Sequence, residues 1–281
     1  MNDLRLSVLI ALLVLSPPWP SSASAETTRY VRFEQAGDAH YGIEAGERIE
    51  VLDAAPWNGG KPTGKSVAAG EVRLLAPVEP RQVFAVGFNY LSHRGDRELP
   101  PHPPIFLKLP GAVIGPGDDI VYPPGAHNVH YEAELVVVIG RKASRVPAAL
   151  AGDFIFGVTA GNDVSERDWQ AADLQWFRGK ASDTFAPIGP AVVSGLDYLN
   201  LLVESRLNGE TMQSQNSREQ IHDVHAIVSY ISKYATLHPG DVIFTGTPGE
   251  TSAMVPGDVV EIEVEGVGVL QNRIGKPVDE K

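Results

Sequence analysis

The chain has 281 residues, of which 43% are hydrophobic and 21% charged. These proportions are typical of a globular protein and exclude a disordered, fibrous or multi-span membrane protein. It contains no cysteine, which excludes disulfides, thiol catalysis and cysteine-held zinc or iron–sulfur clusters. With 35 acidic against 23 basic residues its net charge is −12, which disfavours nucleic acid and anionic membranes as partners.

The first 25 residues have the pattern of a secretory signal peptide. Arg5 precedes a short apolar run, Leu6 to Leu15, and the small residues Ala23-Ser24-Ala25 follow. A charged start, a hydrophobic core too short to span a bilayer and a small-x-small site together predict cleavage before Glu26. We therefore expect an exported protein, periplasmic or secreted, with no membrane attachment after cleavage.

Residues 26–78 are predicted to form a small N-terminal β domain. Alternating segments at Tyr30 to Phe33, Tyr41 to Ile43 and Arg48 to Leu52 are each followed by turn residues, which favours an antiparallel sheet. The segment from Ala54 to Gly70 is rich in Gly, Pro and Lys, and is predicted to be a flexible surface loop.

This predicted loop contains a match to the phosphate-loop pattern G-x-x-x-x-G-K-[ST], at residues Gly59 to Ser66. The motif binds phosphate only where a buried strand leads into it and a helix leaves it. The preceding residues, Asp53 to Asn58, do not resemble a strand, and only a few residues separate the motif from Gly70. We interpret the match as a coincidence on a surface loop.

Residues 79–281 are predicted to form the main domain, which is rich in strands. Pro-Gly-Asp turns begin at Pro116, Pro239 and Pro256, and each is followed by a β-branched run. Proline presets the first dihedral angle of such a turn and glycine supplies the positive φ. With few helices and no alternating strand–helix pattern, the sequence predicts an α+β, mainly β fold.

Two helices are predicted in this domain. Ser217 and Gln220 have the spacing of a capping box, and apolar residues recur at helical spacing as far as Leu237. The second helix is expected to run from Ser165, as its N-cap, to Trp176 or Phe177. Its aromatic residues Trp169, Trp176 and Phe177 are expected to pack in the core.

Three carboxylates form the candidate reactive centre. Glu132 and Glu134 lie two residues apart at the start of an apolar strand, so their side chains point to the same face. Such a pair alone is typical of a solvated strand face, but Asp163 ends a second apolar strand. Together they suit a hard cation such as Mg²⁺, Mn²⁺ or Ca²⁺. Nearby positive residues that could meet an anionic substrate are Arg167, Arg178 and Lys180.

The remaining histidines near these segments are His127 and His130, before the glutamate pair, and His222 and His225 at i and i+3. They could form a second metal site. Histidines in such positions are more often surface or packing residues, and we favour that interpretation.

The chain from about Arg81 to its C-terminus resembles the fumarylacetoacetate hydrolase family. The resemblance is carried by an ordered set of motifs: Val86-Gly87-Phe88-Asn89-Tyr90 with His93, Pro104 to Lys108, Tyr131 to Leu135, Asn162 to Gln170, Gly179 to Pro187, and Thr245-Gly246-Thr247-Pro248. Residues 29–79 are similar to the small N-terminal domain of the family only loosely.

The resemblance implies a β-sandwich-like or roll core with few helices, and a homodimer. It also implies Mg²⁺ or Mn²⁺ held by Glu132, Glu134 and Asp163. Family enzymes act on small anionic 2-oxo or 1,3-dioxo acids, and a metal that chelates adjacent oxygens would stabilise an enolate. We expect hydrolytic C–C cleavage of an acylpyruvate or fumarylacetoacetate type of substrate. Decarboxylation or isomerisation, and an exported protein that binds an organic acid without turnover, are the alternatives.

The resemblance also implies roles for individual residues. His93, oriented by Asp96, would be the general base that activates water, and Lys180 would stabilise developing negative charge. The substrate would be held by three further side chains, Arg167, Gln170 and Thr247.

Two departures from the family pattern affect these roles. The family has His-x-x-Glu where this chain has His93-Arg94-Gly95-Asp96, so Glu98 could substitute for Asp96. The usual glycine-rich continuation after Thr-Gly-Thr-Pro is Gly249-Glu250-Thr251-Ser252-Ala253 here, so substrate contacts are expected to differ in this segment.

Overall fold

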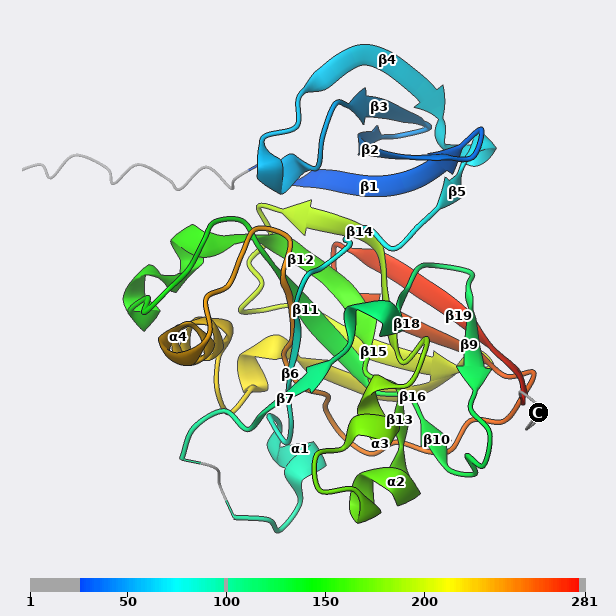
Figure 1. Cartoon of the computed structure of the whole chain (residues 1–281), viewed down its shortest axis with the longest axis vertical. Coiled ribbons are helices and arrows are strands. Elements are labelled where there is room, and N and C mark those ends of the chain that lie inside the picture. The colour runs from blue at the N-terminus through cyan, green and yellow to red at the C-terminus, as the bar shows by residue number, and fades with distance from the viewer. Residues whose placement is uncertain (1–25, 99–100, 278–281) are drawn as a thin grey trace, which may run out of the picture.

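The computed structural model describes residues 26–98 and 101–277 (Figure 1). The predicted signal peptide, with Arg5 and the run Leu6 to Leu15, lies outside the described residues. Within the described ranges, no helix is long and apolar enough to cross a membrane.

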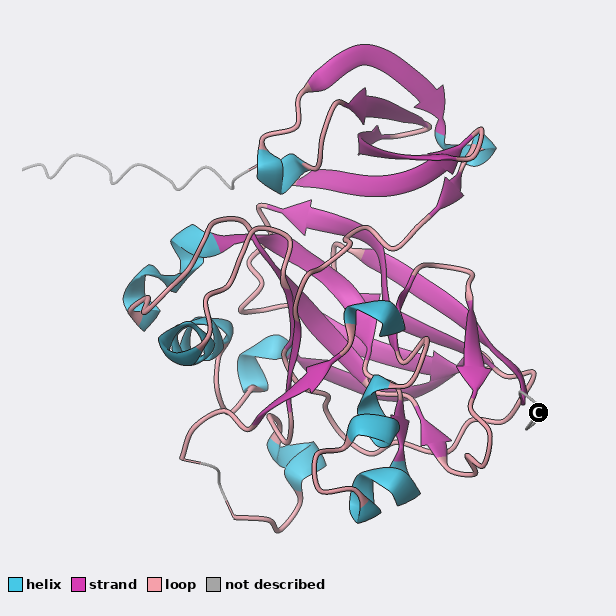
Figure 2. Cartoon of the chain, viewed as in Figure 1, coloured by secondary structure: helices cyan, strands magenta, loops and turns pink. Residues whose placement is uncertain are grey.

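Strands dominate the molecule and the helices are short (Figure 2). This confirms the predicted α+β, mainly β class. The largest sheet has the order β4 (Pro62–Ala68), β3 (Arg48–Leu52), β2 (Asp38–Ala45), β1 (Thr28–Gln35), β14 (Ala186–Ser194), β12 (Ile155–Asn162), β11 (Ala133–Ile139), β17 (Val242–Phe244), β6 (Val83–Val86) and β7 (Ile105–Lys108), with β5 (Arg73–Leu74) beside β1 and β8 (Val113–Ile114) beside β14.

A second sheet packs against the middle of the first. Its order is β16 (Glu210–Asn216), β15 (Leu202–Leu207), β18 (Val259–Val264), β19 (Gly268–Pro277) and β9 (Asp119–Tyr122). A separate pair joins β10 (Val129–His130) to β13 (Ser165–Glu166). The helices are α1 (Leu91–Arg94), α2 (Arg167–Ala172), α3 (Phe177–Ala181) and α4 (Val224–Tyr234), with 3₁₀ turns at Pro56–Asn58, Ala69–Glu71, Pro110–Ala112, Ala148–Phe154 and Ser217–Glu219.

Strand β11 explains the long apolar run of the sequence, because both of its faces are buried. Leu135 and Val137 point into the core cluster between the two sheets, which also contains Ile262 of β18. Val136 and Val138 point to a second cluster on the opposite side of the large sheet. A strand covered on both faces is apolar at every position rather than alternating.

The predicted N-terminal strands are present as β1, β2 and β3. The structure also shows that β1 pairs with β14, so this small sheet continues into the large one. The expected loop from Ala54 to Gly70 is wrong, because β4 lies within it and pairs with β3. Most β4 side chains are exposed, so the strand leaves no apolar alternation in the sequence. The phosphate-loop match runs into this strand, and not into the helix that phosphate binding requires.

The three Pro-Gly-Asp turns are confirmed, since they lead into β9, β17 and β18. Each glycine has positive φ: 79° at Gly117, 84° at Gly240 and 100° at Gly257. In each turn the aspartate side chain accepts a hydrogen bond from the backbone amide three residues earlier. The side chain therefore closes the turn that glycine permits.

The helix predicted from Ser217 begins later, at Val224. Residues 217–219 form only a 3₁₀ turn, whose capping box uses Asn216 and Glu219. The N-cap of α4 is Asp223, whose Oδ1 accepts from the Ala226 amide at 2.7 Å. Two good N-caps, Asn216 and Asp223, lie seven residues apart in the sequence, and the second of them begins the helix.

The helix predicted from Ser165 is split. Ser165 is buried in β13, and Glu166 caps α2 by accepting from the Trp169 amide at 2.6 Å. The chain then leaves the helix and resumes it as α3, after Trp176 in the left-handed region with φ of 56°. Helices α1, α2 and α3 lie at the end of the molecule away from the N-terminal sheet (Figure 1).

Candidate active site

The pairing of β11 with β12 brings the three carboxylates together. Ala133 lies opposite Asn162, so Glu132 and Asp163 are adjacent beyond the pair, and the Asp163 amide donates to the Glu132 carbonyl at 2.9 Å. Glu134, one residue into β11, points to the same side as Glu132. Carboxylate oxygens of the three residues lie within 4.8 Å of one another, and all three residues are buried. We call this cluster the carboxylate cup.

Two buried lysines and an arginine bind the cup. Lys180 Nζ, from α3, lies 2.8 Å from Glu132 Oε2 and 2.7 Å from Asp163 Oδ2. Lys108 Nζ, at the end of β7, binds Asp163 Oδ1. Arg167, at the start of α2, lies 2.5 Å from Glu132 Oε1. The formal charges of the three cations match those of the three carboxylates.

These contacts decide the protonation of two groups. Burial opposes ionisation of Glu132, but Lys180 and then Arg167 outweigh it and hold its pKa well below the ordinary value. Burial likewise opposes the charged form of Lys180, and Asp163 and Glu132 outweigh it, so its pKa is raised. Both side chains are therefore charged at neutral pH.

Glu134 differs from its neighbours, because no described Lys, Arg or His side chain makes an ion pair with it. Its Oε2 accepts a hydrogen bond from the Gly246 amide at 2.6 Å. Burial first, and then Asp163 and Glu132, raise its pKa well above the ordinary value. A buried carboxylate beside two others lacks a positive charge that a divalent cation would supply. Each carboxylate oxygen can accept a second partner, so the donor set fits a hard divalent ion.

Gly246 is required where it donates to Glu134. Its φ is 104°, and a Cβ there would lie 2.5 Å from the Cβ of Asn89. Only glycine combines this conformation with that close approach. The glycine of Thr245-Gly246-Thr247-Pro248 thereby places a backbone amide on the cup.

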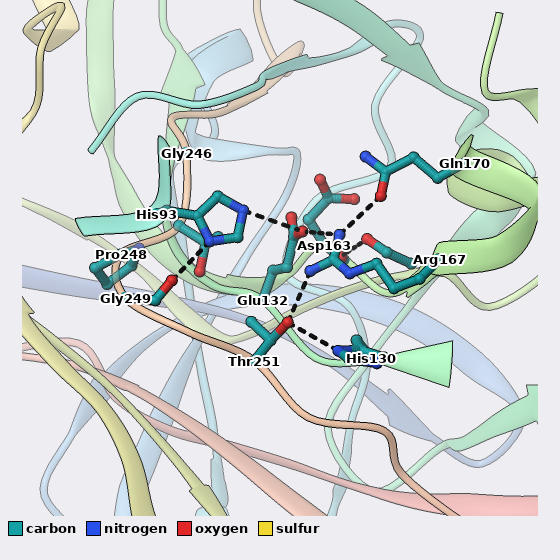
Figure 3. A network of polar contacts seen from close by, with 12 residues as sticks. His93, His130, Glu132, Asp163, Arg167, Gln170, Gly246, Pro248, Gly249 and Thr251 are labelled. Carbon is teal, nitrogen blue, oxygen red and sulfur yellow. Dashed lines mark hydrogen bonds and ion pairs between the residues drawn. The ribbon is translucent and has the colours of Figure 1, made fainter. Parts of the chain in front are cut away.

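His93, in α1, faces the cup with one ring nitrogen. Its Nδ1 lies 2.7 Å from the Gly249 carbonyl oxygen, which can only accept, so Nδ1 carries the proton. Nε2 is then the basic nitrogen of the neutral ring, and it lies 3.9 Å from Glu132 Oε1 (Figure 3). The expected orienting carboxylate is replaced by a carbonyl: Asp96 and Glu98 are both exposed.

The three proposed substrate-binding residues lie at different depths. Arg167 and Gln170 line an open cleft of about 580 Å³, and Arg167 also donates to Gln170 Oε1 at 2.8 Å. Thr247 is buried and lines a small recess together with Lys180 and Glu132. Its Oγ1 accepts from Gln213 Nε2 at 2.9 Å. The cleft and the recess share His93 and Gln170, so the cup opens into the cleft.

The aromatic residues of the split helix do not all pack in the core as expected. Trp176 lines both cleft and recess, and its ring packs edge-on against Phe88 and Phe106. Phe177 is exposed, whereas Trp169 packs against the main core. Arg178, a candidate substrate cation, does not reach the cup.

Arg178 stacks over Trp169 and pairs with Asp173 at 2.6 Å on the surface. This ion pair occupies the guanidinium away from the carboxylates. Of the three predicted cations, only Arg167 and Lys180 therefore contact the cup. The structure adds a third cation, Lys108.

The site also contains groups that sequence reasoning missed. Lys108 ends the motif Pro104 to Lys108, and a lysine at the end of an apolar strand is itself a signal of buried pairing. The Gly246 amide and the Gly249 carbonyl are backbone groups, which no residue type identifies. Thr251 and His130 hydrogen-bond to each other at 2.9 Å beside Arg167. Burial, then Arg167, lowers the pKa of His130 to about 4, so its ring is neutral at pH 7.

Fold and site together define a mainly β protein with a buried carboxylate centre suited to a divalent cation, open to a polar cleft. The family model "Fumarylacetoacetate (FAA) hydrolase C-terminal" matches residues 82–275, and "Rv2993c-like, N-terminal" matches residues 28–77. The chain belongs to the fumarylacetoacetate hydrolase family.

Relatives within the family carry out different reactions. The chain is 34% identical to the mitochondrial oxaloacetate tautomerase FAHD2A of Bos taurus, over 95% of this chain and 97% of that protein. It is 40% identical to 5-carboxymethyl-2-hydroxymuconate delta-isomerase from Mycobacterium smegmatis, with a TM-score of 0.83 over 88% of this chain and 99% of that one. A fumarylpyruvate hydrolase from Pseudomonas aeruginosa, solved with Mn²⁺ and pyruvate, is 32% identical, with a TM-score of 0.66 over 72% of this chain and 91% of that one.

Proposed function

We propose that the protein is a divalent-metal-dependent enzyme that isomerises a small 2-oxo acid by moving a proton between carbon and oxygen. The observation that carries this proposal is the geometry of His93. Its Nδ1 is held by a carbonyl and its basic Nε2 faces the cup. A neutral imidazole so placed can take up and return a proton, and isomerisation requires no activated water.

Glu132, Glu134 and Asp163 would hold Mg²⁺ or Mn²⁺, and the ion would supply Lewis-acid polarisation of the substrate oxygens. The Mn²⁺ in the fumarylpyruvate hydrolase structure supports a divalent metal in this family. Because Lys180 and Arg167 already offset two of the carboxylates, Glu132 and Asp163, a bound dication beside Glu134 would leave the centre positive. A positive centre favours an anionic acid as substrate.

The residues around the cup would transfer the proton, stabilise the developing charge and bind the substrate. His93 Nε2 takes the proton from the carbon next to the carbonyl, the electron pair of the C–H bond forms the carbon–carbon double bond, and the proton is delivered to the carbonyl oxygen. Lys180 stabilises the negative charge that develops on that oxygen. Arg167 and Gln170 bind the substrate carboxylate, and Thr247 closes the inner end of the recess.

Hydrolytic C–C cleavage is the second candidate. The cleft of about 580 Å³ beside the cup leaves space for a longer substrate arm, and the fumarylpyruvate hydrolase relative supports this chemistry. His93 would then activate water. The tautomerase and the isomerase each match most of the chain, but so does a fumarylacetoacetate hydrolase from Exiguobacterium antarcticum, so the preference for proton transfer rests on the geometry of His93.

The test offers the purified protein with Mg²⁺ or Mn²⁺ two kinds of substrate. Enol oxaloacetate is followed by its ultraviolet absorbance, with the total oxaloacetate measured at the end, and a panel of acylpyruvates is followed by pyruvate release. Faster enol decay with oxaloacetate conserved supports isomerisation, and pyruvate release supports hydrolysis. Tight metal-dependent oxalate binding without turnover of any substrate would identify a binding protein and overturn the proposal.

We further propose that residues 1–25 export the chain and that it acts as a homodimer. The N-terminal pattern of Arg5, the apolar run and Ala23-Ser24-Ala25 supports export. N-terminal sequencing of protein recovered from the periplasm or medium tests the cleavage before Glu26. Sedimentation of the mature chain tests the dimer.

A further inference from the structure

Arg167 is held on the side away from the cup as well as on the side facing it. One terminal nitrogen binds Glu132 Oε1 and Gln170 Oε1, and the other donates to Thr251 Oγ1 at 2.8 Å (Figure 3). A guanidinium group is planar and only donates, so acceptors on two sides fix the plane in which its donors lie. The hydroxyl of Thr251 is the acceptor on the cleft side.

The Thr251 hydroxyl is oriented by a chain of hydrogen bonds. Asn128 Nδ2 donates to Asp168 Oδ1 at 2.9 Å, which leaves Asn128 Oδ1 to accept from His130 Nε2 at 2.8 Å. The other ring nitrogen of His130, Nδ1, lies 2.9 Å from Thr251 Oγ1. The Thr251 hydroxyl is therefore held between His130 and Arg167, and its oxygen accepts from Arg167 at 2.8 Å.

The segment that carries Thr251 is fixed to the strand that carries His130. The Met254 amide donates to the Val129 carbonyl at 2.7 Å, and Ala253 forms a β-bridge with His130. The hydroxyl oxygen of Ser252 lies 3.2 Å from that of Tyr131. The acceptor for Arg167 is thus in place before a ligand arrives, so little ordering is needed on binding.

We propose that Thr251, oriented by His130 and Asn128, is a positioning residue that aims the Arg167 guanidinium at the carboxylate of the substrate. This inference rests on the proposed binding of an oxo-acid beside the cup. Thr251, His130 and Arg167 all line the cleft, so the hydrogen bond from Arg167 to Thr251 lies where an acid would enter. Without the hydroxyl, Arg167 keeps its contacts to Glu132 and Gln170 but loses the one that sets its plane.

A pair of variants isolates the hydroxyl. Thr251→Val keeps the shape of the side chain and removes the hydroxyl, whereas Thr251→Ser keeps the hydroxyl. The primary measurement is calorimetric titration of the Mn²⁺-loaded protein with oxalate, a small dianion that needs no turnover. We expect Thr251→Val to bind oxalate about tenfold more weakly, because Arg167 loses the acceptor that fixes the plane of its donors. Thr251→Ser should stay within about twofold of the wild type, and Mn²⁺ affinity without oxalate should be unchanged in both.

On a substrate, Thr251→Val should raise KM with little change in kcat, which a general structural defect would not produce. ¹⁵N spectra of the imidazole give a readout besides activity. They should show the Nε2–H tautomer of His130 in the wild type and a weakened hydrogen bond at Nδ1 in Thr251→Val. If Thr251→Val unfolds, Asn128→Ala breaks the far end of the chain of hydrogen bonds and should weaken oxalate binding in the same direction by a few-fold.

Wild-type oxalate affinity in Thr251→Val would overturn the inference, as would equal losses in the valine and serine variants. Failure of the proposed function is a separate result. A wild type that binds oxalate but turns over no oxo-acid would refute the proposed reaction. The oxalate affinities of Thr251→Val and Thr251→Ser would still test whether the Thr251 hydroxyl positions Arg167.

Discussion

The two sides of the candidate site differ in how firmly they are held. In the carboxylate cup, Glu132, Glu134 and Asp163 are buried, and each receives hydrogen bonds or ion pairs from the described residues around it. In the segment 91–98, His93 is fixed at Nδ1, but Asp96 and Glu98 are exposed. The difference indicates that the residues proposed to bind metal and acid are preorganised, whereas any step that needs an acidic partner for His93 would depend on movement of an exposed segment.

The largest effect is expected on the cup. Asp163→Ala should abolish binding of Mn²⁺ or Mg²⁺ by calorimetry, because it removes one of three ligands and leaves Lys108 and Lys180 without their shared carboxylate. Breaking a buried pair costs about 3–5 kcal/mol, so the variant should also melt at a lower temperature.

Asp163→Asn keeps the shape of the side chain and should also lose the metal, which separates loss of a ligand from loss of packing. The exposed Asp183→Asn is the matched control and should bind metal like the wild type. An unchanged metal affinity in Asp163→Asn would remove Asp163 from the site.

On the other side of the comparison, His93→Ala should lower kcat by about 10²–10⁴-fold, the usual contribution of a general base. Mn²⁺ and oxalate affinity should stay within a few-fold of the wild type, because His93 Nε2 lies 3.9 Å from the nearest cup oxygen. Steady-state kinetics and calorimetry on the same preparation measure both. Turnover that survives in His93→Ala would show that another group transfers the proton.

Lys180 links the two sides, since it pairs with the cup and lines the recess. Lys180→Gln should lower kcat by about 10²–10³-fold, as the loss of one donor to a developing oxyanion does, with metal binding retained. Lys108→Gln is the contrast, because Lys108 pairs with Asp163 away from the recess. It should reduce stability in a thermal melt while changing kcat less than Lys180→Gln does; equal losses of kcat would contradict the separate roles.

The sequence contained the parts of the cup that depend on strand periodicity. Glu132 and Glu134 follow from the two-residue repeat of a strand, and Asp163 from its place after the next apolar strand. Two kinds of feature could not be predicted from the sequence: helix starts for which two N-caps are available, and contacts made by backbone groups. Both Asn216 and Asp223 are good N-caps, and only packing decides which of them begins the long helix. Strand β4 buries too few side chains to leave an apolar pattern in the sequence. The contact of His93 with the Gly249 carbonyl has no sequence signal at all, so a carboxylate partner was expected instead.

The smallest expected effect is also the one that separates the two candidate reactions. Asp96→Asn combined with Glu98→Gln removes both exposed carboxylates near His93 without changing size. If His93 works with only the Gly249 carbonyl behind it, isomerisation should change by less than about twofold, because a carbonyl already fixes the tautomer and the orientation of the ring. Proton uptake makes His93 an imidazolium in both reactions, but hydrolysis must also hold a water molecule beside Nε2, and an exposed carboxylate near His93 can accept a hydrogen bond from that water. Comparing enol decay with pyruvate release in the double variant measures this difference directly. A loss of tenfold or more in isomerisation would mean that the segment 91–98 moves toward the cup during turnover and supplies an acid to His93. The difference in order between the buried cup and this exposed segment would then not hold in the working enzyme.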